Sequence, residues 1–464
     1  ALDGMFAFAI WDSVKNEMFC AIDRFGEKPF FYYQDKSVFV FASEMKGLWA
    51  FGIPKSIKED KIHNYIQTGD VNSKHKPTDT YFYNINKIDA GCSLNISSKG
   101  HFVSSTYWSL DTVSLNSDIT IQEASDKYYQ LFETSVKNRL RSDVSVGSSL
   151  SGGIDSSSIV LMIDQLKINE QNQHVFSARF KNFSKDEGSF INEVKEKSKN
   201  IIGHSVWPEE NSIIDFMDKV VFHQEEPFGS SSILAQWKVM ELANINNVKV
   251  LLDGQGADEY LAGYVPEYKT YLTQLFFENR DKYQDEYSMY KSLYKSQASI
   301  DHYLKSETFR MKLGRYKKNI FKQQVHYDKL KDRLKNNLYS SGFKDLLRYA
   351  DRNSMAFSLE IRLPFLYHKL IEFVFSLPND FLLKNGWSKY IHRKSFENIL
   401  PKKVCWRKDK IGFEPPQNSW LDNKMIKEII EHQRNKYKIS VDQINIGSYT
   451  NSMEWKLFVS SYFQ

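Results

Sequence analysis

The stretch "SVGSSLSGGIDSSSIV" (residues 145–160) sets two glycines, an aspartate and several serines between an expected strand and an apolar helix. Gly152 and Gly153 permit backbone conformations and a close approach that side chains would block, so successive N–H groups can face one anion. Ser156 and Ser157 open the helix, whose first amides lack intrahelical partners and whose dipole favours negative charge. We therefore predict that this turn binds a pyrophosphate group.

Two common phosphate motifs do not occur in the sequence, which contains neither GxxxxGK[ST] nor GxGxxG. An ordinary P-loop NTPase and a dinucleotide dehydrogenase are therefore not indicated. A capped helix start is the alternative, because it would explain serine and aspartate without any ligand. Two glycines ahead of Asp155, at the end of a strand that opens an α/β unit, favour phosphate binding over that plain turn.

The chain around this turn alternates strands with helices. We expect strands at "SVGSSL", "HVFSARF", "HSVWP" and "VKVLLDG", with helical segments between them. This order favours a parallel sheet with crossover helices, which binds ligands at the carboxyl ends of its strands. "LLDGQGADEY" (residues 251–260) ends one such strand and then supplies Asp258 and Glu259, whose oxygens suit a hard cation. A helix cap is the alternative function of these two acids.

The first hundred residues have a different pattern. Short aromatic and β-branched segments predict consecutive antiparallel strands at residues 5–11, 17–22, 29–33 and 37–43. The first segment is apolar without alternation, so we expect both of its faces to be covered and part of this domain to be absent from the chain. A polar, unpatterned linker follows at residues 109–120, and from about residue 265 the second domain is expected to be mostly helical.

Composition narrows the class of protein. A chain of 464 residues with 41% hydrophobic and 15% aromatic residues predicts two or three folded domains. The net charge of +5 does not demand a polyanionic partner, and the basic stretch between Arg310 and Lys335 is interpreted as a solvated helix rather than a nucleic-acid surface. The three cysteines are dispersed, and the sequence contains no apolar run of membrane-spanning length and no signal peptide. We therefore expect a cytoplasmic protein that does not bind a membrane.

Several motifs together resemble one family. "SGGIDSS" resembles the SGGxDS pyrophosphate motif of the N-type ATP pyrophosphatases, and the surrounding chain resembles the glutamine-dependent asparagine synthetases of the class B type. "DGMFAFAIWD", "DRFGEKPFFYY" and "FASEMKGL" resemble the last strands of that family's glutaminase domain, which is an N-terminal nucleophile hydrolase. "RNSMAFSLEIRLPFL" and "KDKIGFEPP" resemble its synthetase half.

The resemblance implies an α/β fold with two domains. Residues 1–108 are expected to form a partial type-2 glutamine amidotransferase domain, the remnant of an αββα N-terminal nucleophile hydrolase fold. After the linker at 109–120, residues 121–464 are expected to form an adenine nucleotide alpha hydrolase-like ATP pyrophosphatase domain with a parallel sheet and a helical C-terminal region. A homodimer is one possible assembly.

The resemblance also implies a reaction that uses ATP and Mg²⁺. A carboxylate, first of all the aspartate side chain, is activated as an acyl-adenylate with release of pyrophosphate, and ammonia from glutamine then displaces AMP. The implied magnesium ligands are Asp155 and Asp258, the implied catalytic lysine is Lys410, and Glu360 and Arg362 match acceptor-site residues. The implied ATP-binding residues are Leu150, Ser151, Gly152, Gly153, Asp155, Ser156, Ser157, Asp253 and Gly254.

The sequence departs from the family pattern in its acceptor motifs. Gln255 stands where the family has a carboxylate between two glycines, Asp253 replaces the preceding serine, and Tyr367 replaces the aspartate of PFLD. A related amide- or lactam-forming enzyme acting on a peptide, sugar or antibiotic precursor therefore stays open. A tRNA-modifying pyrophosphatase that uses the basic stretch stays open as a third alternative, although no RNA-binding module is attached.

The glutaminase nucleophile of the family, an N-terminal cysteine, does not stand in this sequence, which begins at Ala1. Glutaminase activity is therefore not expected from the chain as given, and only free ammonia is expected to serve it. Cys20 lies inside a predicted strand, so we interpret it as a buried structural thiol.

Overall fold

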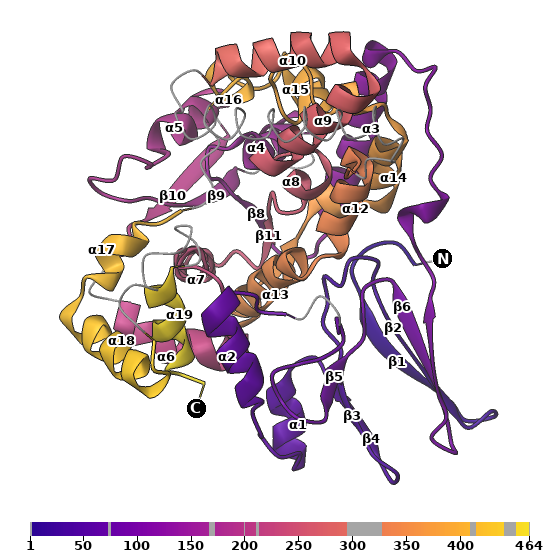
Figure 1. The fold of residues 1–464 in the computed structure, drawn as a ribbon, viewed down its shortest axis with the longest axis vertical. Coiled ribbons are helices and arrows are strands. Elements are labelled where there is room, and N and C mark those ends of the chain that lie inside the picture. Colours follow the sequence, from indigo (N-terminus) through magenta and orange to yellow (C-terminus); the bar gives the residue numbers. More distant parts are fainter. Residues whose placement is uncertain are drawn as a thin grey trace, which may run out of the picture.

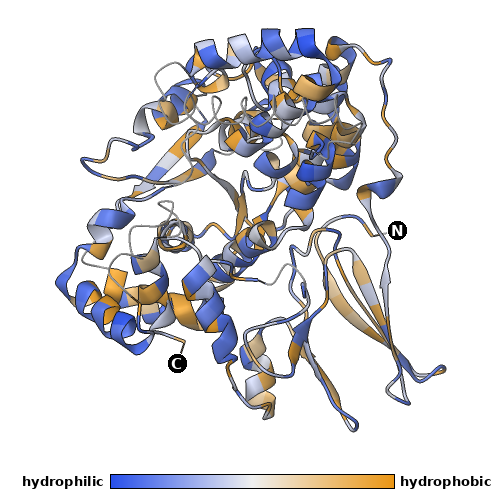
Figure 2. Cartoon of the chain, viewed as in Figure 1, coloured by the Kyte–Doolittle hydropathy of each residue, from blue (hydrophilic) through white to orange (hydrophobic). Residues whose placement is uncertain are grey.

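The computed structural model describes residues 2–72, 76–166, 172–198, 200–209, 213–294, 327–408, 414–439 and 452–463. The fold is α/β and contains a four-stranded, a five-stranded and a three-stranded sheet. In Figure 1 the N-terminal strands lie at the lower right, the five-stranded sheet crosses the centre, and the last helices lie at the lower left. The central strands carry both hydrophobic and hydrophilic residues, whereas the outer helices α10 (Arg280–Leu293) and α18 (Lys424–Lys436) are largely hydrophilic (Figure 2).

The N-terminal residues form two antiparallel sheets. One has the order β1-β2-β6-β7 and the other β4-β3-β5. The four segments predicted as strands are strands, but they divide between the two sheets. Cys20 is fully buried, as predicted. The elements are β1 (Ala7–Asp12), β2 (Glu17–Ile22), β3 (Phe31–Gln34), β4 (Phe39–Ala42), α1 (Met45–Phe51), α2 (Glu59–Thr68), β5 (Ile85–Lys87), β6 (Cys92–Ser97) and β7 (Phe102–Thr106).

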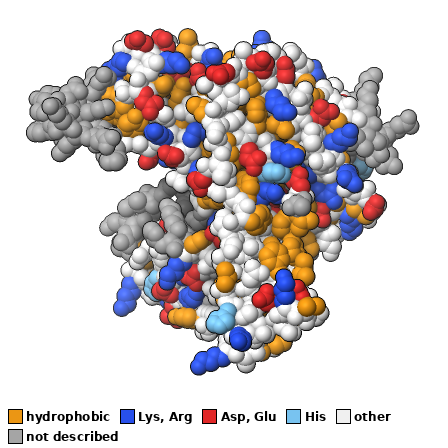
Figure 3. All heavy atoms as spheres, turned by 90° about the vertical axis from the view of Figure 1, so that its right-hand side faces the viewer, with side chains coloured by type: hydrophobic (Ala, Val, Ile, Leu, Met, Phe, Trp, Pro, Cys, Tyr) orange, Lys and Arg blue, Asp and Glu red, His pale blue; other side chains and the backbone are white. Residues whose placement is uncertain are grey.

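One face of strand β1 is largely uncovered among the described residues. Ile10 is 55% exposed and Trp11 is 53% exposed. Ala7 and Ala9 pack on the small core beneath the sheet, around Cys20. Figure 3 looks onto this side of the molecule and shows hydrophobic side chains gathered on its lower part.

The central sheet is entirely parallel, with the order β10-β9-β8-β11-β12. The four strands predicted from the alternating pattern are present, and a short fifth strand follows them at one edge. The three residues of β11 are all buried because helices cover both faces of the sheet. The strands are β8 (Val146–Ser149), β9 (Gln173–Ala178), β10 (Ile201–Val206), β11 (Val250–Leu252) and β12 (Glu360–Arg362).

Helices connect these strands and form most of the described part of the chain after residue 265, as predicted. The helices around the sheet are α3 (Ile121–Arg139), α4 (Ile154–Leu166), α5 (Gly188–Glu196), α6 (Ile213–Gln224), α7 (Ser232–Ile245) and α8 (Ala257–Tyr260). The later helices, with α10 and α18, are α9 (Val265–Glu278), α12 (Leu330–Tyr339), α13 (Ser341–Met355), α14 (His368–Ser376), α15 (Tyr390–Phe396), α16 (Lys402–Cys405), α17 (Gln417–Leu421) and α19 (Met453–Ser460).

The segment predicted as a linker is packed on the second domain. Leu110 is 4% exposed and its N–H donates to the Tyr339 hydroxyl at 3.2 Å. Asn116 N–H donates to the carbonyl of Ser376 at 2.7 Å. Helix α3 begins directly after Thr120, which forms a capping box with Glu123. The start of α3 thus coincides with the predicted boundary, but the preceding segment is part of the fold.

One hydrophobic core is built from both predicted domains. Tyr65 of α2 and Phe82 pack in the same cluster as Trp420 of α17 and Trp455 of α19. The Tyr65 hydroxyl also donates to the carbonyl of Phe228 at 2.8 Å. The N-terminal domain is therefore joined to the C-terminal helices by apolar packing as well as by the chain.

Charged contacts reinforce this junction. The Glu225 carboxylate accepts from the N–H groups of Met45 at 3.0 Å and Lys46 at 2.7 Å, at the N-terminus of α1. It also pairs with Arg352 of α13 at 3.1 Å. Glu225 thus supplies from the second domain a cap that α1 lacks in its own sequence.

Most of the basic stretch that begins at Arg310 lies outside the described residues, which resume at Tyr327. In the described part, Arg333 pairs with Glu267 at 3.2 Å, and Lys335 pairs with Asp111. These basic side chains are engaged by the protein itself. No helix in the described ranges is long and apolar enough to cross a membrane.

Candidate active site

The turn between β8 and α4 needs glycine for two reasons. Gly152 has a φ of +81°, which L side chains rarely adopt, and a Cβ there would lie 2.8 Å from the Cβ of Phe190. The same Cβ would lie 3.1 Å from the backbone nitrogen of Ile191. Helix α4 begins immediately, since Ser157 N–H donates to the carbonyl of Gly153 at 3.1 Å. The first amides of the helix therefore lie at the carboxyl end of β8.

Serine hydroxyls hold the turn in shape. Ser151 N–H donates to Ser156 Oγ at 3.2 Å, and the two hydroxyl oxygens lie 3.1 Å apart. Gly153 N–H points to Ser151 Oγ at 3.3 Å. Hydrogen bonds among its own residues thus hold the turn in shape, and the first amides of α4, which lack intrahelical partners, are the donors left for an anion.

The second glycine-rich loop lies directly beside the first. Leu252 pairs with Ser148 of β8, so Asp253 leaves the sheet at the same edge. A Cβ on Gly254 would lie 3.1 Å from both the Cβ of Asp155 and the backbone nitrogen of Ser156. The structure therefore brings together the two loops that the sequence placed at neighbouring strand ends.

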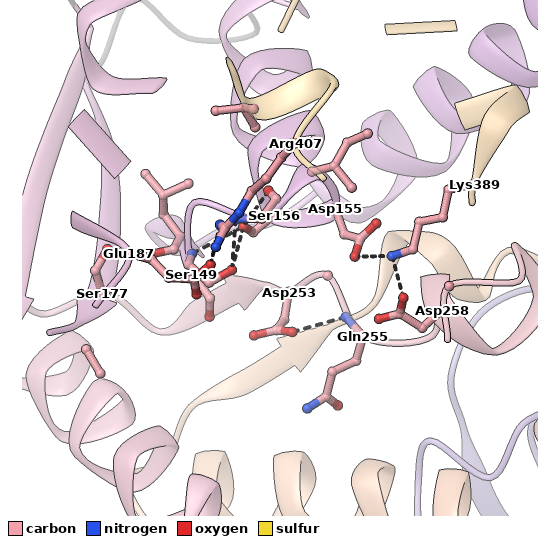
Figure 4. A pocket seen from close by; sticks show the side chains of 18 of the residues that line it. Ser149, Asp155, Ser156, Ser177, Glu187, Asp253, Gln255, Asp258, Lys389 and Arg407 are labelled. Atoms are coloured by element: carbon pink, nitrogen blue, oxygen red, sulfur yellow. Dashed lines mark hydrogen bonds and ion pairs between the residues drawn. The ribbon is translucent and has the colours of Figure 1, made fainter. Parts of the chain in front are cut away.

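A buried lysine connects the two acids predicted to bind magnesium. Lys389 Nζ lies 2.5 Å from Asp155 Oδ2 and 2.7 Å from Asp258 Oδ1 (Figure 4). Burial by itself lowers the pKa of Lys389, but the two carboxylates outweigh it and leave this pKa above its ordinary value. Lys389 is therefore charged at neutral pH, and both carboxylates converge on one cation.

This pair of carboxylates fits Mg²⁺. Protein-bound Mg²⁺ is commonly held by one or two carboxylates together with substrate phosphates. Asp155 and Asp258 come within 2.7 Å of a single nitrogen, beside a phosphate-type turn. Among the described residues no group of three or more His, Cys, Asp or Glu side chains is suited to hold a metal by itself. The donor set therefore suits a metal whose remaining ligands come from phosphate and water.

The turn, the second loop and Lys389 surround a cavity of about 270 Å³. Its apolar lining includes Phe176, Ala178 and Val239. Figure 4 shows Ser177 and Glu187 on one side of the cavity and Lys389 with its two carboxylates on the other. Of the predicted ATP-binding residues, Gly152 and Ser157 lie behind the wall. The others line the cavity, namely Leu150, Ser151, Gly153, Asp155, Ser156, Asp253 and Gly254.

Sequence reasoning missed several residues of this wall. Arg407 lies over the ring of Phe190 at 3.8 Å and pairs with Glu187 at 2.6 Å. Arg393 and Lys389 come from α15 and from the residue before it. None of these residues belongs to a motif with a known spacing. Their positions in the cavity wall therefore could not be predicted from the sequence and are seen only in the folded structure.

The structure does not bring the predicted acceptor residues to this cavity. Glu360 and Arg362 pair with each other at 2.6 Å, and Arg362 also donates to the carbonyl of Arg139 at 2.6 Å. Neither side chain is part of the cavity wall. Lys410, predicted as the catalytic lysine, lies outside the described residues.

Of the three positions that depart from the family pattern, Asp253 lines the cavity, and the other two differ in their placement. Gln255 lines the cavity, and its side-chain oxygen is buried without a hydrogen-bond partner among the described residues. Tyr367 is 5% exposed and is not part of the cavity wall. Of these two departures, Gln255 is the one placed to contact a ligand.

A buried histidine positions α4 from behind. His392 of α15 lies 2.9 Å from Ser158 Oγ and 3.1 Å from the Tyr128 hydroxyl. Burial lowers the pKa of His392 well below its ordinary value, and the nearby charge of Lys389 adds to this effect. The imidazole is therefore neutral at pH 7 and ties α4 to α3 and α15.

Comparison with known proteins agrees with this geometry. Residues 127–448 match the asparagine synthase family model, and residues 1–108 match the glutamine amidotransferase domain. The chain is 28% identical to asparagine synthetase [glutamine-hydrolyzing] 1 of Bacillus subtilis, over 96% of this chain and 73% of that protein. It is 33% identical to putative asparagine synthetase [glutamine-hydrolyzing] 2 of Methanocaldococcus jannaschii, over 58% of this chain and 51% of that protein.

A relative with a different name also matches. The amidase chyE of Penicillium rubens is 27% identical over 57% of this chain and 40% of its own length. The matches to the two domain models confirm the predicted resemblance, the α/β fold class and the ligase class. The chain belongs to the asparagine synthase family.

Proposed function

We propose that this protein converts a carboxylic acid into an amide in two steps. A carboxylate oxygen attacks the α-phosphorus of ATP and pyrophosphate leaves, giving an acyl-adenylate. Ammonia then attacks the acyl carbon, and AMP leaves. Family membership supports ATP-dependent amidation in general. The observation that carries the two-step form is the meeting, in one cavity, of the phosphate-type turn with the carboxylates of Asp155 and Asp258.

The turn is suited to hold the leaving pyrophosphate. The first amides of α4 lack intrahelical partners and lie beside the Ser151 and Ser156 hydroxyls at the carboxyl end of β8, so they would stabilise the negative charge that grows as the bond to the α-phosphorus breaks. Mg²⁺ held by Asp155 and Asp258 would neutralise phosphate charge there. The ammonium of Lys389 contacts both carboxylates and adds positive charge at the same place.

The remaining roles follow from the resemblance. Lys410 is proposed to stabilise charge as pyrophosphate leaves and as the amine attacks, and Glu360 and Arg362 are proposed on the acceptor side. The proposed acceptor is the aspartate side chain, because the first two relatives are named asparagine synthetases. Glutamine or free ammonia is the proposed nitrogen source. The proposed location is the cytoplasm, and a homodimer is a proposed assembly.

Gln255 favours a second candidate acceptor class. A neutral amide in the cavity wall cannot act as a base or pair with an amine as a carboxylate does. The second candidate is therefore amide or lactam formation on a peptide, sugar or antibiotic precursor. Pyrophosphate release with aspartate, compared with release with other carboxylic acids, separates the two candidates.

The experiment supplies the purified chain with MgATP, ammonium chloride and a panel of carboxylic acids, and measures AMP and pyrophosphate. We expect equal amounts of both products, and only with a suitable acid. Asp155→Asn and Asp258→Asn should each lower the rate at least about 100-fold. The matched control is Asp126→Asn, because Asp126 lies on the exposed side of α3 and contacts Gln122. Formation of ADP, or AMP release that needs no acid, would contradict the proposal.

A further inference from the structure

A second cavity lies apart from the candidate active site. It has a volume of about 610 Å³ and is lined by residues of α9, α12, the end of α14 and the segment before α3. No residue lines both cavities. Lys331 of α12 is part of its wall, together with the apolar side chains Leu110, Val113, Tyr271, Leu275 and Phe375.

The amine of Lys331 is held by α14. It donates to the carbonyl of Val374 at 2.7 Å and lies over the ring of Phe375 at 5.4 Å. Among the described residues no carboxylate pairs with it, and burial lowers the pKa of Lys331 to about 7. At pH 7 about half of these amines are therefore neutral, compared with about one in 3,000 at the ordinary lysine pKa of 10.5.

The other charged side chains of this cavity set its electrostatic character. Lys335 pairs with Asp111, and Lys282 lies 3.6 Å from Asp380. Glu278 accepts hydrogen bonds from two neighbouring side chains. Apart from Lys331, the charged residues of the wall are Asp111, Glu278, Lys282, Asp332, Lys335 and Asp380. Acids outnumber bases among them, so the cavity favours a neutral reagent over an anionic one.

We propose that Lys331 is a site of Nε-acylation by neutral thioesters of short carboxylic acids. The neutral amine nitrogen attacks the acyl carbon, a C–N bond forms, the C–S bond breaks, and the leaving thiolate takes up the proton that the nitrogen loses. Desolvation among apolar side chains is one way in which proteins activate a lysine as a nucleophile. The product is an uncharged amide, whose N–H can keep the hydrogen bond to the Val374 carbonyl and which burial penalises less than an ammonium.

The experiment treats the whole chain at pH 7 with S-acetyl-N-acetylcysteamine, a neutral thioester, and follows the acetylation of each lysine by mass spectrometry of peptides. We expect Lys331 to react at least about 10-fold faster than Lys282. Lys282 is the matched control, because it lines the same cavity but is 61% exposed and lies beside Asp380. Absence of acetylation at Lys331, or a rate no higher than that of Lys282, would overturn the proposal.

A second measurement tests the environment of the amine. Because acetylation removes a charge that burial penalises, the treated protein should unfold at a higher urea concentration than the untreated protein. Lys331→Met is treated in parallel, since its other lysines can react whereas position 331 cannot, and we expect no gain in this variant. An equal gain in both proteins would assign the effect to other lysines and overturn the proposal. The proposed function does not depend on either result, because the two cavities share no residue.

Discussion

Replacing Lys389 by methionine removes the cation on which Asp155 and Asp258 converge. Removal of one partner from a buried ion pair costs about 3–5 kcal/mol, because it leaves a charge uncompensated. Here the ammonium contacts two carboxylates at 2.5 Å and 2.7 Å, whose side chains are 19% and 21% exposed. Solvent at the carboxylates reduces the loss, so we expect the lower end, about 3 kcal/mol, in the free energy of unfolding.

Mg²⁺ should rescue this variant. A cation that binds only the folded state stabilises it by about 2.7 kcal/mol at a concentration 100 times its dissociation constant. In the unmodified protein the ammonium of Lys389 already compensates the two carboxylates, whereas in Lys389→Met a cation would be their main compensation. We therefore expect MgCl₂ to raise the urea midpoint of the variant more than that of the unmodified protein.

The control is Lys394→Met on the same helix. Lys394 pairs with Glu397 one turn away, and both side chains are about 30% exposed. Loss of such an exposed pair costs less than about 1 kcal/mol and creates no site for a cation. If Lys389→Met unfolds at the same urea concentration as the control, or if Mg²⁺ stabilises both variants equally, the two carboxylates do not share a cation and the reasoning is refuted.

Two further predictions concern the frame of the site, and a third concerns a buried lysine elsewhere in the fold. Gly152→Ala forces a Cβ onto a residue with a φ of +81° and to within 2.8 Å of another side chain. We expect a loss of about 2 kcal/mol in urea unfolding and weaker ATP binding, whereas Gly342→Ala, with its nearest contact at 3.9 Å, should change little. The pKa of His392 is lower in the folded protein than in the unfolded chain. Below about pH 6.5 the unfolded chain therefore binds a proton that the folded protein does not, and the free energy of unfolding should fall by up to about 1.4 kcal/mol per pH unit as the pH is lowered. His392→Gln should remove that slope, and an unchanged slope would contradict the assignment. Burial lowers the pKa of Lys331 to about 7, so between pH 7 and pH 10 the unfolded chain binds the extra proton and stability should rise with pH. Lys331→Met should therefore stabilise the protein more at pH 7 than at pH 10, and equal gains at both pH values would exclude this effect.

The central sheet was predictable because each of its first four strands has an apolar run, a turn and a helix in order. The edge strand β12 was missed although the sequence carries its signal. In residues 359–363, Leu359, Ile361 and Leu363 are buried, whereas Glu360 and Arg362 point away from the core. This alternation predicts a strand with two outward polar side chains. Because residues two apart lie on the same face of a strand, Glu360 and Arg362 are close enough to pair with each other.

The site was predictable where motif and strand end coincide. Gly152, Asp155 and Asp258 lie in loops that follow neighbouring parallel strands, so their meeting follows from the topology. Lys389 gives no such signal. It lies more than a hundred residues beyond Asp258, in a left-handed conformation with a φ of 52°. Its place between the acids depends on how α15 packs against α3, which sequence patterns do not specify.

The core shared by α2, α17 and α19 bears on how the molecule can be divided. Cutting the chain near residue 120 would expose Trp420 and Trp455 to water. It would also remove the hydrogen bonds that the Glu225 carboxylate accepts from the first amides of α1. The two segments match separate family models, yet they share this core, so we expect them to unfold together. We therefore expect an isolated fragment of residues 121–464 to expose this apolar core and to aggregate, which light scattering of the fragment would measure.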